Sequence, residues 1–216
     1  MKTLNKTLLS MAVGVAMVAG SQAMAGVEAN IGAASNYLWR GVTQTNDGAA
    51  ISGGLDWSND TGLYVGTWAS NVSWTTPAGY ELDLYAGYGG ELGSGMGYDV
   101  GYIAYLYPIG DANSDFSEVY ANLSYGPVTG SVSYQVDADA TEENYLYLAL
   151  SADFDIAEDI GLSLYGGDYD FGDDDGSYTH FGASVSKGDF AFAIDKTDQD
   201  DAAGDPRVTV SWSTSF

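Results

Sequence analysis

A small set of charged residues is placed where their side chains could face a common interior. The acids are Glu81, Asp83, Asp99, Glu118 and Asp195, with Glu28 and Asp56 in the same pattern, and the bases are Arg40 and Arg207. Most fall on the polar side of segments in which apolar and polar residues alternate. An enclosure lined mainly by carboxylates attracts cations and raises their local concentration. The chemistry indicated is weak cation selection in a pore, unless some of these acids lie at strand ends in bulk water.

The two arginines occupy special places in the chain. Arg40 ends the first alternating segment and Arg207 begins the last. If the segments close into a barrel, the two guanidiniums lie near one mouth, and Asp195 on the adjoining strand is the expected partner. Two interpretations follow: a constriction or anion site that uses both signs of charge, or a structural ion pair at the closing seam.

Two clusters of aspartates are candidates for binding hard cations. Asp168, Asp170, Asp173, Asp174 and Asp175 crowd one connection, and a second acidic connection follows residue 197. Oxygen ligands at this density suit Ca²⁺ or Mg²⁺. However, Gly172 stands at the fifth position from Asp168 and no Glu closes the loop, so the spacing departs from an EF-hand. A solvated acidic loop is the simpler interpretation.

Catalytic chemistry has little support. The chain has no Cys, and its single histidine is His180. The nearest hydroxyl on the same predicted face is Ser184, about 13 Å along an extended strand and too far for a hydrogen bond. We therefore expect no enzyme activity, no cofactor and no thiol-ligated metal.

Tyrosines form the other recurrent group on the polar face. They are Tyr85, Tyr105, Tyr120, Tyr145, Tyr147, Tyr165 and Tyr178. Aromatic rings could stack on planar solutes, or they could fill and narrow a modest barrel.

The elements that would hold these residues are strands. Twelve alternating segments are predicted, at 27–40, 49–57, 62–70, 79–88, 97–106, 117–125, 127–136, 144–153, 160–167, 178–187, 189–196 and 207–216. Most are eight to ten residues long, near the length of a tilted transmembrane strand. The opposite face carries residues such as Leu146, Leu148 and Leu150. A soluble sheet usually presents Lys, Glu and Arg to water, whereas this polar face has almost no Lys, which favours a lumen.

The connections alternate in length, as in outer-membrane barrels. The longer ones are 41–48, 71–78, 107–116, 137–143, 168–177 and 197–206, and they are predicted to face outside. Those at the other end are short, for example Gly126-Pro127, except for a long Gly-rich turn from Gly89 to Met96.

Both ends of the chain indicate export. Lys2 and Lys6, an apolar run and Ala23-Met24-Ala25 have the order of a cleavable signal peptide over 1–25. Cleavage leaves 26–216 with 30 acids against 4 bases, a net charge of −26 that argues against nucleic acid as a partner. The last segment ends in Phe216, an aromatic C-terminus of the kind that the barrel assembly machinery reads.

Several segments also carry a family resemblance. The runs 35–41 (SNYLWRG), 62–71 (GLYVGTWASN) and 81–88 (ELDLYAGY), followed by Tyr107-Pro108 and the strand 207–216, occur in this order. In this respect the chain resembles the TorF-type porin family of proteobacteria over nearly all of 26–216. The resemblance implies an outer-membrane location and a pore, and it carries over no catalytic or binding residues.

The sequence therefore predicts an all-β protein, a closed antiparallel transmembrane barrel of about twelve strands. The leading hypothesis is passive diffusion of small solutes or ions across the outer membrane, with lipid as the surrounding partner. The alternatives are a closed barrel with a structural or surface-interaction role through its acidic loops, and a soluble secreted β-protein.

Overall fold

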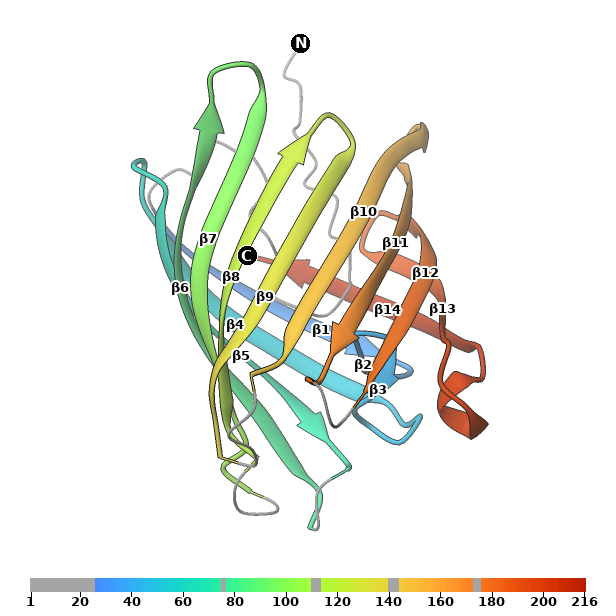
Figure 1. Cartoon of the computed structure of the whole chain (residues 1–216). Coiled ribbons are helices and arrows are strands. Elements are labelled where there is room, and N and C mark those ends of the chain that lie inside the picture. The colour runs from blue at the N-terminus through green and yellow to red at the C-terminus, as the bar shows by residue number, and fades with distance from the viewer. Residues whose placement is uncertain (1–25, 75–76, 110–113, 140–143, 173–175) are drawn as a thin grey trace.

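Twelve antiparallel strands form a closed barrel in the computed structural model (Figure 1). The structure describes residues 26–74, 77–109, 114–139, 144–172 and 176–216, so the predicted signal peptide lies outside it. The barrel strands are β1 (Gly26–Ala34), β4 (Ala50–Ser58), β5 (Leu63–Val72), β6 (Gly79–Leu92), β7 (Met96–Leu106), β8 (Phe116–Tyr125), β9 (Val128–Ala138), β10 (Leu146–Ala157), β11 (Ile160–Asp170), β12 (Ser177–Lys187), β13 (Phe190–Thr197) and β14 (Arg207–Ser215). Each strand pairs with its neighbour in sequence, and β1 closes the ring against β14. The prediction of a twelve-stranded barrel is confirmed.

The closing seam is secured at the end of the chain. Asn30 pairs with Ser215 and Ala34 with Ser211 in the β1–β14 ladder. Beyond the ladder, the N–H of Phe216 donates to the carbonyl of Ala29 at 2.9 Å, and the N–H of Ala29 donates back at 3.0 Å. The last residue thus completes the seam through its backbone, and Phe216 as a whole is 79% exposed.

The outer surface is a belt of apolar side chains, as the alternation predicted. Leu148, Leu150, Phe181, Phe192 and Val210 all point outward. Leu150, for example, is 62% exposed. Exposed apolar side chains on every strand are the pattern of a barrel surrounded by lipid. Among the described residues, no helix is long and apolar enough to cross a membrane.

The two ends of the barrel differ. One end, called here the loop end, carries the inward-turning residues 35–49, the described parts of the connections after β5, β7, β9 and β11, and the connection 198–206 with the 3₁₀ turn η1 (Asp201–Gly204). The other, the turn end, carries the short connections and both strand termini, Gly26 and Ser215. The expected long turn at 89–96 is wrong. The β6–β7 ladder continues through Gly89–Asp99 and Gly90–Tyr98 to Leu92–Met96, so that the turn is confined to residues 93–95.

The first predicted strand is also too long. β1 ends at Ala34, and residues 35–49, called here the inward segment, turn into the barrel and form the hairpin β2 (Leu38–Trp39) and β3 (Val42–Thr43). Arg40 and Gly41 connect these strands with φ of 50° and 81°, the positive values of a type I′ turn. In Figure 1 both short strands lie within the outline of the barrel near the loop end.

Candidate functional site

The inward segment is fixed to the lumen wall on one side. Tyr37 is 2% exposed, and its hydroxyl donates to the carboxylate of Glu81 on β6. Tyr107 donates to the other oxygen of Glu81 at 2.7 Å. Tyr37 also packs edge-on against Trp68, with ring centroids 5.5 Å apart. One buried carboxylate and two rings therefore fix this part of the segment against β5 and β6.

The polar side chains of the inward segment stabilise its own fold. Thr43 donates to Asn36 Oδ1 at 2.7 Å, and the side-chain amide of Asn36 donates to Asp47 at 2.8 Å. The N–H of Tyr37 donates to Thr45 at 3.1 Å. These short polar residues replace the ladder hydrogen bonds that the segment leaves when it departs from β1.

Arg40 lies at the tip of the segment, in the turn between β2 and β3. Its Nη2 donates to Glu118 on β8 at 2.7 Å, and the side chains of both residues are almost fully buried. The guanidinium carbon lies 4.2 Å from the ring centre of Trp39, 4.1 Å from Tyr147 and 4.5 Å from Tyr169. A non-glycine residue with φ of 50° costs of order 1–3 kcal/mol. The ion pair and the three rings offset that cost and hold the charge in one place.

Large side chains pack together on one side of the lumen. Tyr85, Ile103, Tyr105 and Tyr120 form a buried cluster on β6, β7 and β8, with Tyr64, Trp68, Tyr107 and Phe116 against it. This matches the interpretation in which inward tyrosines fill the barrel. Further round the wall, Tyr145 and Tyr147 each pack edge-on against Tyr169.

Glycines on neighbouring strands let these rings lie flat on the wall. Tyr85 pairs with Gly66 and Tyr64 with Gly87 across the β5–β6 ladder. A Cβ built on Gly66 would approach the Tyr85 ring to 2.4 Å, and one on Gly87 would meet the Tyr64 hydroxyl at 2.2 Å. The same relationship joins Tyr120 to Gly101 and Tyr165 to Gly182. In each of these pairs a tyrosine ring lies over a glycine of the neighbouring strand, and this arrangement accommodates large side chains in a narrow barrel.

Inward acids are held by tyrosines. Glu81 accepts from Tyr37 and Tyr107, Asp56 from Tyr85, Asp99 from Tyr64 and Asp195 from Tyr165. Hydrogen bonds of this kind satisfy carboxylates that are removed from bulk water.

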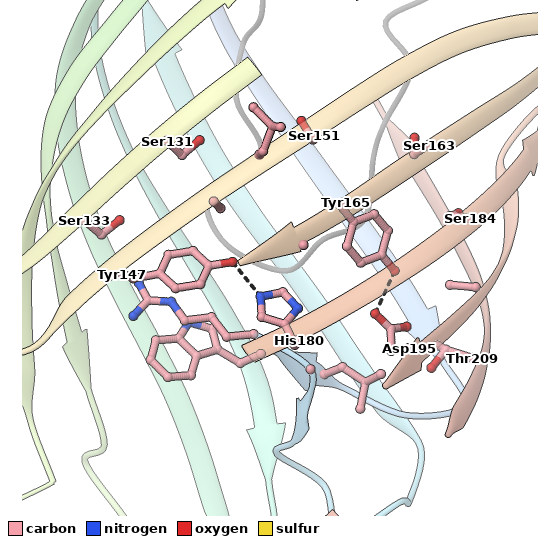
Figure 2. A pocket seen from close by; sticks show the side chains of 18 of the residues that line it. Ser131, Ser133, Tyr147, Ser151, Ser163, Tyr165, His180, Ser184, Asp195 and Thr209 are labelled. Carbon is pink, nitrogen blue, oxygen red and sulfur yellow. Dashed lines mark hydrogen bonds between the residues drawn. The ribbon is translucent and has the colours of Figure 1, made fainter. Parts of the chain in front are cut away.

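The other half of the lumen is open. A cavity of about 210 Å³ lies beside Trp39 and Arg40; β9 to β14 form one wall, and Ile103, Tyr105 and Tyr120 of the buried cluster contribute to the other. Its wall carries small and hydroxylated side chains, and Figure 2 shows Ser131, Ser133, Ser151, Ser163, Ser184 and Thr209 around it. Two hydrogen-bonded pairs project into it, Tyr147 with His180 Nε2 and Tyr165 with Asp195, each at 2.7 Å. The buried cluster and the inward segment thus leave a cavity beside Arg40.

The structure separates the predicted lumen residues into two groups. Glu118, Asp195 and Arg40 line the cavity, as does Asp153, which the sequence analysis did not single out. Glu81 and Asp83 are 2% and 6% exposed and lie behind the inward segment. Asp99 is half-buried, accepting from Tyr64 at 2.7 Å and Asn122 at 3.1 Å, and Glu28 is exposed at the turn end.

The prediction that Asp195 is the partner of Arg40 and Arg207 at the closing seam is wrong. Arg40 does not continue the first strand, so it pairs with Glu118 across the lumen. Arg207 instead donates through Nε to Asp47 of the inward segment at 2.9 Å and through Nη1 to the carbonyl of Ala203. Asp195 stands opposite Arg207 in the ladder but accepts from Tyr165. The seam thus has an ion pair, but with a different acid.

The acidic connections are described only in part. Asp168 and Asp170 are exposed at the loop end of β11, while Asp173, Asp174 and Asp175 lie outside the described residues. Within the described ranges, no three His, Cys, Asp or Glu side chains come together as a metal site. In the next connection the backbone N–H of Thr179 donates to Asp198, which holds the pKa of that carboxyl below its usual value.

Sequence reasoning missed the inward segment. Alternation continues through Tyr37, Trp39 and Gly41, so the pattern of a strand persists where the chain turns inward. The available signal was the cluster Asn36, Thr43, Thr45, Asn46 and Asp47, because such residues favour turns.

Comparisons with known proteins agree with this architecture. No curated protein matches the chain. Among solved structures, the "KdgM porin" matches with a TM-score of 0.60 and 8% identity, over 88% of this chain and 99% of that one. A structure of "porin" matches with a TM-score of 0.42 and 18% identity, over 76% of this chain and 62% of that one. Pseudomonas aeruginosa OprD matches with a TM-score of 0.39 and 12% identity, over 88% of this chain and 67% of that one. At these identities the likeness to KdgM concerns the fold alone, and the other two scores are too low to add to it. Residues 18–208 match a family model, and the chain therefore belongs to the family described as "Bacterial protein of unknown function (Gcw_chp)".

Proposed function

We propose that this protein is an outer-membrane channel, without catalytic activity, through which small solutes diffuse passively. The observation that carries the proposal is the one-sided lumen. The inward segment and the tyrosine cluster narrow the barrel, and a cavity of about 210 Å³ remains between that cluster and the small polar side chains of β9 to β14. A fully packed interior would have no reason to keep that wall small and hydroxylated.

The proposed location in the bacterial outer membrane rests on the apolar outer belt and the porin-like fold. The predicted signal peptide over 1–25 and the C-terminal Phe216 fit export followed by insertion through the barrel assembly machinery. The TorF-type porin name, which the motifs suggest, is part of this proposal.

Weak cation preference is a further part of the proposal. The charged residues of the cavity are Arg40, Glu118, Asp153 and Asp195. Because Arg40 is neutralised by Glu118 at 2.7 Å, the two aspartates leave the passage net negative. A negative passage favours cations over anions.

A closed barrel with a structural or surface role is the second candidate. It is favoured by the strength with which the inward segment is held, through Tyr37–Glu81, Arg40–Glu118 and Arg207–Asp47. If the segment seals the lumen, the exposed acidic connections, among them a possible divalent-cation loop at 168–175, become the functional surface.

Conductance separates the candidates. Purified protein is inserted in planar bilayers across a KCl gradient. Discrete steps with a reversal potential on the cation side support the channel. Folded protein, verified by heat-modifiable migration, that inserts without conducting supports the closed barrel.

A further inference from the structure

We propose that the outer wall of the barrel binds one phosphorylated membrane lipid, with an acyl chain in a groove at Gly166 and the phosphate at Lys196. This site lies on the lipid-facing surface and goes beyond the proposed channel function. It rests only on the membrane location that is part of that function. Two observations carry it: a groove in the apolar belt, and the place of one lysine beside that groove.

One row of cross-strand neighbours on the outer surface alternates large side chains with glycine. From β8 to β13 the row is Leu123, Gly130, Leu150, Gly166, Phe181 and Lys196. Leu150 is 62% exposed and Phe181 56% exposed, and the glycine between them offers no side chain to either. The glycine positions therefore leave hollows between the large side chains of the belt.

The hollow at Gly166 belongs to a groove of about 710 Å³ on β9 to β12. Its apolar side chains include Leu148, Leu150 and Phe181, all of which are exposed on the outer surface. From Leu148 to Ala152 on β10 the groove extends for roughly 13 Å, at about 3.3 Å per residue. A hollow left empty forfeits van der Waals contacts along its walls, and the flexible chain of a lipid can fill it.

Lys196 lies at the upper end of the same row, one strand beyond Phe181. Because barrel strands are tilted, the row climbs from Leu123 near the turn end of β8 to Lys196 near the loop end of β13. Two strand spacings of about 4.8 Å separate Gly166 from Lys196. A lipid whose chain lies at Gly166 can therefore bring its phosphate to the ammonium group, as lysines near a membrane surface favour.

The ammonium group of Lys196 is available for this contact. The chain has four basic residues after residue 25. Both arginines form ion pairs with acids of the protein, whereas among the described residues no ion pair engages Lys196. Lys187 is the other exposed lysine, and it lies at the opposite end of the barrel, where β12 ends.

A second copy of this chain suits the groove less well than a lipid does. Exposed acids stand at the loop end of the groove. Asp168 is the ladder neighbour of Thr179, and Asp198 accepts from the N–H and the hydroxyl of Thr179 at 2.8 Å and 3.0 Å. Two copies packed through this face would bring these like charges together. A lipid brings a single phosphate to the lysine and adds no second acidic surface.

Lipid binding is measured by native mass spectrometry of the purified protein in detergent. The probe is palmitoyl-oleoyl phosphatidylglycerol. Palmitoyl-oleoyl glycerol has the same chains without a phosphate, and glycerol phosphate has the phosphate without chains. We expect one phosphatidylglycerol to be retained per chain with saturation, several-fold weaker binding of the diacylglycerol, and no binding of glycerol phosphate.

Lys196→Gln tests the phosphate contact. We expect the dissociation constant for phosphatidylglycerol to rise roughly fivefold, the effect of one lysine close to a lipid phosphate. Lys187→Gln is the matched control, because it removes the same charge from the opposite end of the barrel. It should leave the binding of the lipid unchanged.

Ala152→Leu tests the groove. Ala152 shares the outward face of Leu150 and lines the groove, so a larger side chain there should displace the acyl chain and weaken binding several-fold. Ala121→Leu on β8 is the control, because Ala121 also faces outward but lies away from the groove. Heat-modifiable migration verifies that each variant is folded.

The outcomes separate this site from the proposed function. Protein that conducts but retains no phosphatidylglycerol, or retains the diacylglycerol equally well, overturns the lipid site and leaves the channel standing. Protein that retains the lipid without conducting overturns the channel and leaves the site standing. Equal effects of the two lysine variants would mean non-specific adsorption, and a dimer that Ala152→Leu dissociates would mean a second copy in the groove; either result overturns the lipid site.

Discussion

Arg40 and Glu118, 78 positions apart in the chain, meet at 2.7 Å inside the barrel with their side chains 6% and 1% exposed. The pair joins the tip of the inward segment to the opposite wall. It sets where the open half of the lumen begins, since both residues line the cavity.

Arg40→Ala should destabilise the barrel and widen the passage. Removing one partner of a buried ion pair leaves the other charge uncompensated, at about 3–5 kcal/mol. Urea unfolding in lipid vesicles measures the loss, and single-channel conductance should rise. Glu118→Ala added to Arg40→Ala should recover part of the stability, because no lone charge then remains.

Arg207→Ala is the matched control for that experiment. Arg207 pairs with Asp47, whose side chain is 60% exposed, and it also donates to the carbonyls of Ala202 and Ala203. Because Asp47 stays solvated when its partner is removed, we expect a smaller loss than from Arg40→Ala. Equal losses from Arg40→Ala and Arg207→Ala would contradict the special position of the buried pair.

Gly182→Ala should disturb the open wall of the lumen. A Cβ there would lie 2.5 Å from the Tyr165 ring and 2.7 Å from Asp195 Oδ1. The ring must move into the cavity, so we expect a loss of about 1–3 kcal/mol and a smaller conductance. Gly130→Ala is the control, because nothing lies within 4 Å of its Cβ position. A Gly182 variant indistinguishable from the Gly130 variant would show that the ring has room to spare.

Ion selectivity should depend on the acids of the open wall. Asp153→Asn with Asp195→Asn removes the two carboxylates that line the cavity without a basic partner. The K⁺/Cl⁻ permeability ratio, from reversal potentials, should fall toward unity. Glu81→Gln with Asp83→Asn should change it less, because those acids lie behind the inward segment. A larger change in the permeability ratio from Glu81→Gln with Asp83→Asn than from Asp153→Asn with Asp195→Asn would place the ion path along β6.

Much of the architecture follows from alternation alone. Strands such as β12 and β10 were predicted because Phe181 and Leu148 recur on one face while polar residues occupy the other. Period-two patterning fixes the face and the rough length of each strand. It cannot distinguish a strand that stays in the sheet from one that leaves it, and residues 35–40 continue the pattern into the lumen.

The candidate site could be predicted from the sequence only in part, for a related reason. Lumen acids such as Glu118 and Asp195 were identified because they lie on the polar face of an alternating strand. Their partners are set by the inward segment, a long-range contact that no local pattern encodes. The division into packed and open halves depends on which strands place glycine opposite tyrosine, as Gly66 and Tyr85 do. That pairing requires the register, which becomes known only when the barrel is closed.

Phe216→Ala tests the C-terminal residue as an assembly signal. The substitution keeps the backbone bonds of residue 216 to Ala29 and removes the ring of a residue that is 79% exposed. Refolding of the purified protein into detergent should therefore be unaffected. In cells, the heat-modifiable form in outer-membrane fractions should decrease several-fold if the barrel assembly machinery reads the ring. Phe190→Ala is the control: Phe190 is 61% exposed, and it pairs with Trp212 on the same sheet. An equal decrease for both variants would mean that lost lipid contact explains the effect, whereas a decrease for Phe216 alone identifies the terminal aromatic as the element that directs insertion.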